Sequence, residues 1–190
     1  SLNQIKSADV TFDLLVQNYK IQARGLISGG SDFLLIETSQ DILNVKAAIQ
    51  GIQLAKSDLN TNNIPFAIQC TIENMGTTLG GQDIESFYLT IRHNDLLWIG
   101  MNCATGPKFM REHLRILSQI SSHPISIVPN AGLPDEYGNY NETPTEFSKT
   151  IEEYIKNGGK LIFHLPMFHI VDKDNYKAYL KVDFKPFAYQ

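Results

Sequence analysis

Five short apolar segments alternate with amphipathic helical patterns along most of this chain, and that alternation restricts the fold to a few architectures. The apolar segments, expected to be strands, are residues 32–37, 66–72, 97–102, 124–128 and 160–163, and they recur at roughly the 30-residue spacing of a βαβ unit. Helical patterns precede the first segment and separate the others, at residues 11–27, 41–59, 83–93, 107–121 and 143–157. Apolar strands joined by helical crossovers predict a parallel sheet covered on both faces.

Two α/β architectures have this order of elements: an open doubly wound sheet and part of a TIM (β/α)8 barrel. A dinucleotide-binding sheet carries Gly-x-Gly-x-x-Gly in its first strand–helix turn, but Glu37-Thr38-Ser39 occupies that place. With 190 residues, the chain is short for a closed barrel, which usually needs about 250. The sequence therefore predicts one domain of parallel β/α units.

Composition excludes several classes of partner. The formal net charge is -4 and the charges are scattered, so neither a nucleic-acid surface nor a polybasic membrane anchor is expected. The apolar runs are far shorter than the ~18 residues of a membrane span, and the polar first residues do not resemble a signal peptide. Two cysteines are too few for a disulfide framework, which makes a reduced cytoplasmic location the expectation.

Polar side chains mark the carboxyl ends of the predicted strands, where α/β barrels gather their functional residues. These residues are Glu37, Thr71, Glu73, Asn102, Cys103, Pro129, Asn130 and His164. Cys103 follows an apolar strand and precedes Gly106-Pro107, a placement that favours a metal ligand or nucleophile over a buried small residue. Cys70 has apolar neighbours within a strand and is expected to be a core residue.

The other candidates have simpler alternatives. Glu37 could be a solvated strand end, and Asp41 is expected to serve the start of the next helix. The glycine-rich loop at 76–81 could cradle an anion, although a flexible connector is the favoured interpretation. The segment 129–134, Pro-Asn-Ala-Gly-Leu-Pro, is expected to be an ordered functional loop rather than a plain connector.

Several of these segments together resemble the homocysteine-binding, zinc-containing barrel of cobalamin-dependent methionine synthases, from about residue 11 to residue 162. The matching pieces are residues 32–38 and 41–48, 77–82, Asn-Cys-Ala-x-Gly-Pro within 101–107, and Pro-Asn-Ala-Gly-Leu-Pro at 129–134 followed by 137–140. The wider family includes betaine-dependent and S-methylmethionine-dependent homocysteine methyltransferases, and the last two motifs point to the cobalamin-dependent branch. The fold that the resemblance implies is a TIM barrel.

The resemblance also implies a chemistry. In the family, zinc held by three cysteine thiolates takes the homocysteine sulfur as its fourth ligand, and the resulting thiolate accepts a methyl group. Cys103 matches the first of those zinc cysteines, and Glu37, Asn102 and Asn130 match substrate-binding positions. A carboxylate at Glu37 can pair with the substrate ammonium. Cobalamin and folate would act only through other modules, which this sequence does not show.

Two departures from the family pattern are expected to matter. The adjacent cysteine pair that supplies the other zinc ligands is absent, and residues 162–167 read Ile-Phe-His-Leu-Pro-Met in its place. His164 or His169 could rebuild a zinc site, although the family pattern does not support this. About three strands that precede the helix at 11–27 in the family barrel are also absent, which would leave the sheet edges unpaired.

The expected organisation is a partial homocysteine-binding barrel at residues 1–164 and a divergent tail at 165–190. The expected function is that of a homocysteine S-methyltransferase domain in methionine synthesis, as a truncated and impaired copy whose activity alone is doubtful. The alternative is a non-catalytic binding or assembly protein that keeps the half-barrel. Expected partners are homocysteine and either other methionine synthase modules or a second copy of the chain.

Overall fold

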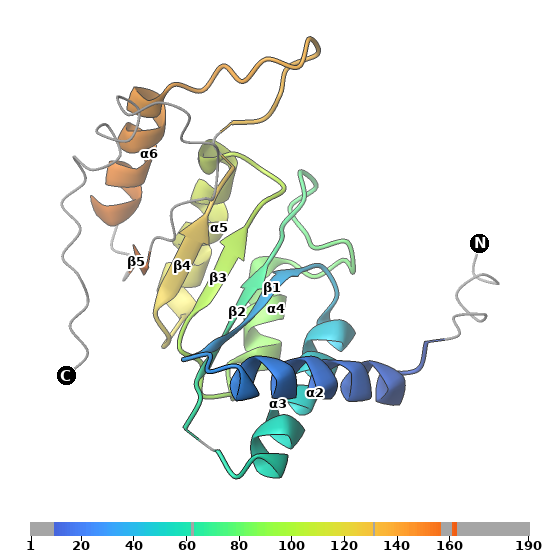
Figure 1. Ribbon diagram of the computed structural model, residues 1–190. Helices are drawn as coiled ribbons and strands as arrows, with labels where there is room; N and C mark the ends of the chain where they lie inside the picture. Colours follow the sequence, from blue (N-terminus) through green and yellow to red (C-terminus); the bar gives the residue numbers. More distant parts are fainter. Residues whose placement is uncertain (1–9, 62, 131, 157–160, 163–190) are drawn as a thin grey trace.

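A parallel five-stranded sheet is the frame of the structure, a computed structural model that describes residues 10–61, 63–130, 132–156 and 161–162. The strands are β1 (Leu34–Ser39), β2 (Phe66–Cys70), β3 (Ile99–Asn102), β4 (Ile125–Val128) and β5 (Leu161–Ile162). Their order in the sheet is their order in the chain, and every pair is parallel (Figure 1). This confirms the predicted parallel β/α units.

Five helices accompany the sheet in the described part of the chain. They are α2 (Phe12–Ser28), α3 (Ile42–Asp58), α4 (Ile84–Ile91), α5 (Pro107–Ile120) and α6 (Pro144–Lys156). Helix α2 packs across α3, and a Cβ on Gly51 would lie 2.7 Å from the Cβ of Tyr19, so the two backbones meet at a glycine. None of the helices within the described ranges has the length and apolar content needed to cross a membrane.

Polar side chains start the helices close to where the sequence predicts. The side chains of Thr11, Asp41 and Asp83 accept the backbone N–H three residues ahead, at 3.2, 2.9 and 2.7 Å. At α6, the Thr143 N–H donates to the Glu146 carboxylate at 2.9 Å and the Glu146 N–H donates to the Thr143 hydroxyl at 3.3 Å, which is a capping box. These bonds satisfy N–H groups that the first helical turn leaves unpaired.

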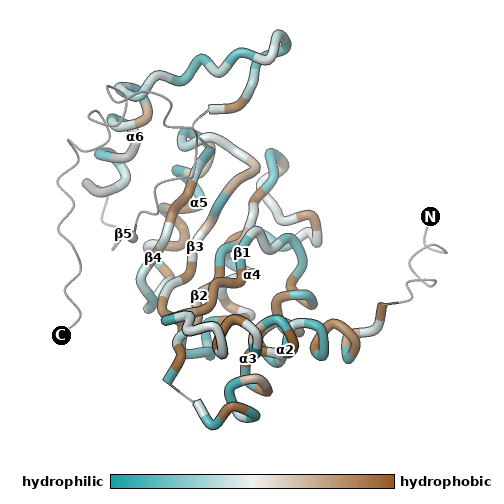
Figure 2. The backbone as a smooth tube through the Cα atoms, viewed as in Figure 1, coloured by the Kyte–Doolittle hydropathy of each residue, from teal (hydrophilic) through white to brown (hydrophobic). Residues whose placement is uncertain are grey.

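One apolar core lies between the sheet and helices α3 to α6. The strands contribute the side chains of one face of the sheet, such as Ile68, Ile99 and Ile127. The helices contribute large side chains such as Phe87 and Leu117, and all of these residues are buried. In Figure 2 the hydrophobic colour follows the strands and the helix faces turned toward them, whereas the long loop before α6 is mostly hydrophilic. Burial of this kind stabilises a domain by about 25 cal/mol per Å² of apolar surface.

The opposite face of the sheet carries small and polar side chains, and its exposure on β1 corrects the expectation that both faces are covered. On β1, Leu35 is 36% exposed and Glu37 is exposed, so this strand is not covered on both faces as its apolar run predicts. The reason is that side chains alternate along a strand, and Leu35 and Glu37 project away from the helices while Leu34 projects toward them.

Gly100 allows a close approach in the middle of this polar face. The side chain of Gln69 on β2 reaches past Gly100 on β3 and donates to the Ser126 hydroxyl on β4 at 2.8 Å. A Cβ on Gly100 would overlap the carbonyl oxygen of Ser126 and lie 2.9 Å from its carbonyl carbon. The neighbour is backbone in a central strand, so it cannot move aside cheaply.

We therefore expect Gly100→Ala to lower the free energy of unfolding by about 3 kcal/mol, at the upper end of the cost of overpacking. The matched control is Gly25→Ala on α2, where an added Cβ meets nothing within 4 Å. That change should raise stability by up to about 1 kcal/mol through helix propensity. Urea unfolding followed by circular dichroism measures both, and equal stabilities of the two variants would contradict the packing described.

Candidate functional site

The side chain of Asn102 ties together the carboxyl ends of β1 and β3. Its amide oxygen accepts the Thr38 N–H at 3.2 Å, and its amide nitrogen donates to the Thr38 hydroxyl at 2.7 Å. The same nitrogen lies 3.2 Å from the sulfur of Cys103. Asn102 is only 1% exposed, so these contacts use a buried amide to fix the position of a thiol.

The backbone around this amide is strained. Thr38, Cys103 and Ala104 all have positive φ angles, of 55, 57 and 53°. Non-glycine residues adopt this left-handed region at a cost of order 1 kcal/mol or more each, and such residues concentrate at functional sites. The register shift of β1 between Ile36 and Ser39 has the same origin, because the chain turns at Thr38 to reach Asn102.

Two more of the predicted residues join the same end of the sheet. The Thr71 hydroxyl, after β2, donates to the carbonyl oxygen of Asn102 at 3.1 Å. The Asn130 N–H, after β4, donates to the carbonyl oxygen of Thr105 at 3.3 Å, and Asn130 is partly exposed. We call the group Thr38, Thr71, Asn102, Cys103 and Asn130 the mouth of the sheet.

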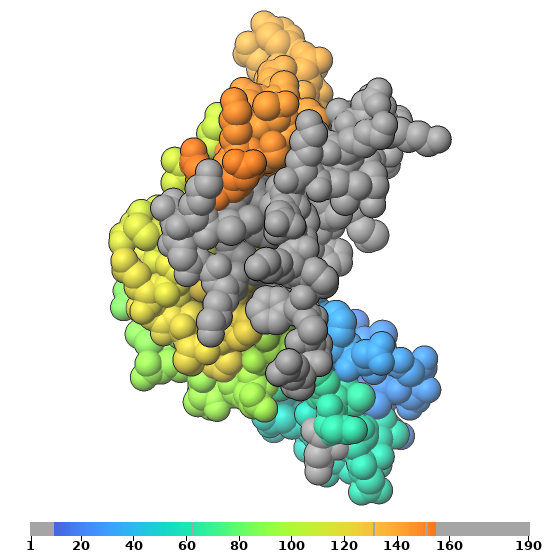
Figure 3. Space-filling view, turned by 90° about the vertical axis from the view of Figure 1, so that its left-hand side faces the viewer, coloured from blue at the N-terminus to red at the C-terminus, as the bar shows by residue number. Residues whose placement is uncertain are grey.

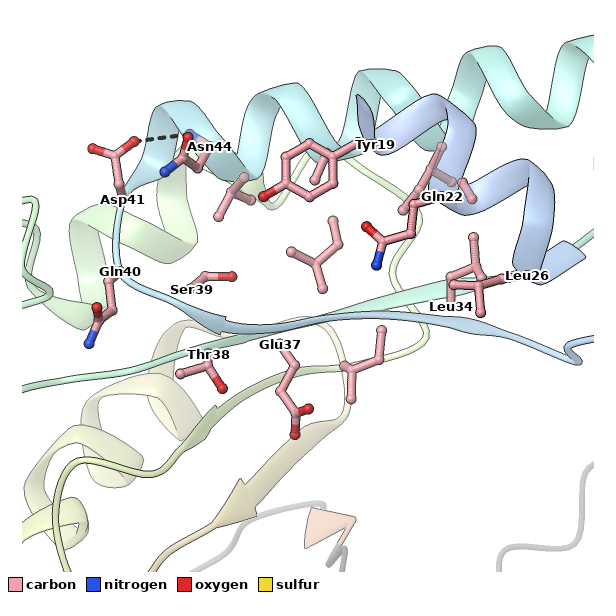
Figure 4. A pocket seen from close by; sticks show the side chains of 16 residues that line it. Tyr19, Gln22, Leu26, Leu34, Glu37, Thr38, Ser39, Gln40, Asp41 and Asn44 are labelled. Carbon is pink, nitrogen blue, oxygen red and sulfur yellow. Dashed lines mark hydrogen bonds between the residues drawn. The ribbon is translucent and has the colours of Figure 1, made fainter. Parts of the chain in front are cut away.

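Glu37 lies beside the mouth with an exposed carboxylate. Figure 4 shows its side chain and that of Thr38 pointing away from α2 and α3. The cavity drawn there, about 460 Å³ between α2, β1 and α3, lies on the helix side of β1, where the labelled Tyr19 and Gln22 project into it. Glu37 and Thr38 are also among the residues that line this cavity, so it extends along β1 to the edge of the mouth.

The glycine-rich loop between β2 and α4 is tied down by hydrogen bonds, which corrects the interpretation of a flexible connector. The Gly80 N–H donates to the carbonyl oxygen of Gln40 at 2.8 Å, and the Gln40 side chain donates to the Glu73 carboxylate at 2.8 Å. Thr78 is fully buried, and its hydroxyl accepts the Gln82 N–H at 3.2 Å. The loop packs against the β1–α3 turn and so forms a fixed side of the mouth.

The two thiols differ in the way the sequence predicts. Cys70 is fully buried, and burial raises the pKa of its thiol to about 12. Cys103 is partly exposed at the mouth and contacts the Asn102 amide. Only Cys103 is therefore placed for chemistry with a ligand.

A catalytic zinc site normally needs three protein ligands, and the described residues do not supply them. Within residues 10–61, 63–130, 132–156 and 161–162, no three His, Cys, Asp or Glu side chains gather closely enough to hold a metal ion. His164 and His169, the candidates for a rebuilt site, fall outside those ranges, as does the expected boundary at 164. The donor set that the structure describes does not fit catalytic zinc.

Sequence reasoning missed two features of the described structure. The sequence did not predict that Thr38 belongs to the site, although its position as a polar residue near the end of the apolar run of β1 could have indicated this. At the other end of the sheet, the buried Tyr88 hydroxyl accepts the Ser122 N–H at 2.9 Å and lies 3.0 Å from the Nδ1 of His123. This network joins α4 to the loop before β4. Tyr88 is 34 residues or more from both of its partners in the sequence, so no local pattern reveals the contact.

Comparison with known proteins identifies a family and several similar solved structures. The family model for homocysteine S-methyltransferase matches residues 2–162. The apo form of the Escherichia coli homocysteine methyltransferase MmuM is similar over 92% of this chain, with a TM-score of 0.69 and 12% identity. Its metallated form is similar over 91%, with a TM-score of 0.63 and 13% identity. The chain spans 59% and 52% of the length of those two structures.

The difference between the thiols predicts selective alkylation. Iodoacetamide at about pH 8 should modify Cys103 in the folded protein and leave Cys70 unmodified, because the thiolate is the reacting form and burial suppresses it at Cys70. Mass spectrometry after digestion reads the two sites separately. In urea both cysteines should react, and Cys103→Ser should abolish labelling of the folded chain. Fast modification of Cys70 in folded protein would show that β2 is less buried than described.

Proposed function

Since the chain belongs to the homocysteine S-methyltransferase family, we propose that its mouth binds homocysteine and that the domain presents the substrate sulfur for methyl transfer. The observation that carries this proposal is the contact of Asn102 with Thr38 and Cys103. It fixes a partly exposed sulfur at the carboxyl end of a parallel sheet, where such folds bind their ligands.

The amino acid end of homocysteine would bind beside the sulfur. Glu37 is an exposed carboxylate on the strand that leads to Thr38, and we assign it to the substrate ammonium. Asn130 is partly exposed on the other side of Cys103 and is assigned to the same end of the substrate. The side chain of Asn102 is already bonded to Thr38, so its part in substrate binding is to orient the thiol and the mouth.

The overall reaction moves a methyl group to the homocysteine sulfur, which gives up its thiol proton and becomes the thioether of methionine. Zinc activation of that sulfur, implied by the resemblance, needs thiolates in addition to Cys103, and the described residues do not contain them. We therefore derive no step through a metal. Cobalamin or folate as a methyl source, a cytoplasmic location, a tail beginning at residue 165 and an impaired activity stay predictions of the same proposal.

A second candidate is a non-catalytic binding or assembly protein that retains the half-barrel. The observation that favours it is the lack, among the described residues, of a third and even a second zinc thiolate near Cys103. Both candidates bind homocysteine and neither needs stoichiometric zinc in this chain, so a stable monomer that binds homocysteine weakly without zinc would favour the second.

Substrate binding is tested at Glu37. Glu37→Gln should weaken homocysteine binding by about tenfold, because a charged hydrogen bond to the ammonium is lost. Isothermal titration calorimetry measures the affinity. The matched control is Asp95→Asn, an exposed carboxylate before β3 at the opposite end of the sheet, which should bind as the unchanged chain does. Equal affinities of both variants would remove Glu37 from the site.

Metal content separates both candidates from an active enzyme with a rebuilt zinc site. A single thiolate loses most of the roughly 10–16 kcal/mol that a complete structural zinc site provides, so we expect well under one zinc per chain after dialysis at about micromolar zinc. Methyl transfer to homocysteine by this chain alone should be undetectable. Stoichiometric zinc that disappears in both Cys103→Ala and His164→Ala would instead establish a rebuilt catalytic site.

A further inference from the structure

A cavity of about 360 Å³ lies between the start of α5 and the loop that joins β4 to α6. Among the residues that line it are Pro107, Lys108, Phe109, Leu133, Glu142 and Glu146. In Figures 1 and 3 these segments form the top of the molecule, with the loop and α6 in orange. The volume is at the small end of the range for sites that bind organic ligands.

The walls of the cavity are apolar on two sides. Phe109 is 38% exposed and Leu133 is 45% exposed, so each offers apolar surface to a ligand, and Pro107 is buried behind them. A ligand placed between Phe109 and Leu133 would remove this apolar surface from water, which favours binding.

The cavity also contains a partly buried carboxylate, that of Glu142. Burial raises the pKa of its carboxyl group above the usual range and Glu146 adds to the shift, whereas Lys108 and a hydrogen bond from the Gly132 N–H oppose it. Glu146 is not equally available, since its carboxylate accepts the N–H and the hydroxyl of Thr143 at 2.9 and 2.8 Å. A cationic group in the cavity would therefore meet Glu142 first.

Lys108 supplies a cation to the same cavity. It is exposed, and none of the ion pairs between described residues includes Lys108 or Glu142. The cavity thus presents a positive group, a negative group and an apolar surface to one small ligand. A simple cation would make no favourable contact with Lys108, and an apolar molecule would make none with either Lys108 or Glu142.

The loop that carries Leu133 and Glu142 is held in place before any ligand arrives. The Asp135 carboxylate accepts the N–H groups of Tyr137 and Asn139 at 2.9 and 2.8 Å and the side-chain amide of Asn141 at 2.9 Å. Pro134 pairs with Tyr140 in an antiparallel bridge. A preformed wall reduces the entropy lost on binding.

We propose that this cavity is a second amino acid site, separate from the mouth, that binds a free α-amino acid with an apolar side chain. The ammonium contacts Glu142, the carboxylate contacts Lys108, and the side chain packs between Phe109 and Leu133. The ligand belongs to the same chemical class as the substrate and product of the proposed reaction, but this site needs neither a thiol nor a metal.

The test uses L-norleucine, an apolar amino acid without sulfur, and the full chain. Amide signals of Lys108, Leu133 and Glu142 are followed by NMR during titration, and a saturable shift with a roughly millimolar dissociation constant is expected for so small a ligand. N-acetyl-L-norleucine, which has no ammonium, should give no such shift. Equal binding of the acetylated compound would overturn the assignment of Glu142.

Variants separate this site from the mouth. Glu142→Gln should weaken norleucine binding about tenfold or more, whereas Glu37→Gln should leave the shifts at Lys108 and Leu133 unchanged. Shifts lost only in Glu37→Gln, or absent from the unchanged chain, would overturn the proposal. Leu133→Asn, on an exposed residue, tests the apolar wall and should also weaken binding. Failure here leaves homocysteine binding at Glu37 untouched, because that is measured with a different ligand and variant.

The proposal has a defined pH dependence. The pKa of Glu142 is raised, so its carboxylate becomes protonated at a higher pH than an ordinary glutamate as the solution is acidified. Norleucine affinity should therefore be full near neutral pH and fall as the pH drops through the raised pKa, and an affinity that rises on acidification would contradict the ion pair with Glu142.

Discussion

The buried amide of Asn102 is the interaction on which the arrangement of the mouth depends. It joins β1 to β3 across the end of β2, although these two strands are not neighbours in the sheet. A buried amide must find partners for its donors and acceptor, and here Thr38 and the sulfur of Cys103 are those partners. The left-handed backbone at Thr38, Cys103 and Ala104 is the cost of bringing these groups together.

That cost is offset by the regular parts of the fold. Helices α2, α3, α4 and α6 begin at side-chain caps, and the core between the sheet and α3 to α6 is continuous. The close approach at Gly100 also belongs to the regular part of the fold. Because Gly100 has no side chain, Gln69 and Ser126 can form a hydrogen bond across β3. Strain at the end of the sheet is tolerated when the middle of the sheet is well packed.

Much of this fold could be read from the sequence, because the signals were local. Apolar runs and polar caps such as Thr11 and Asp41 predicted each strand and helix to within two or three residues. Cys70 and Cys103 were assigned correctly to core and mouth for the same reason. What could not be read were contacts between distant residues, such as the bond of Asn102 to Thr38 across 64 positions. The exposure of Leu35 was missed because an apolar run does not show which of its two faces is covered.

The sheet order has a consequence for how the chain is made. Within the part of the chain that the structure describes, each strand pairs with the strands before and after it in the sequence, so none of these pairings waits for a distant part of the chain. As the polypeptide leaves the ribosome, β2 can add to β1, and β3 to β2, each bringing the helix that covers it. Until the next strand emerges, the growing edge is a row of open hydrogen-bonding groups. The molecule can thus be assembled in the direction of translation, and the newest strand is the one most in need of protection by a chaperone.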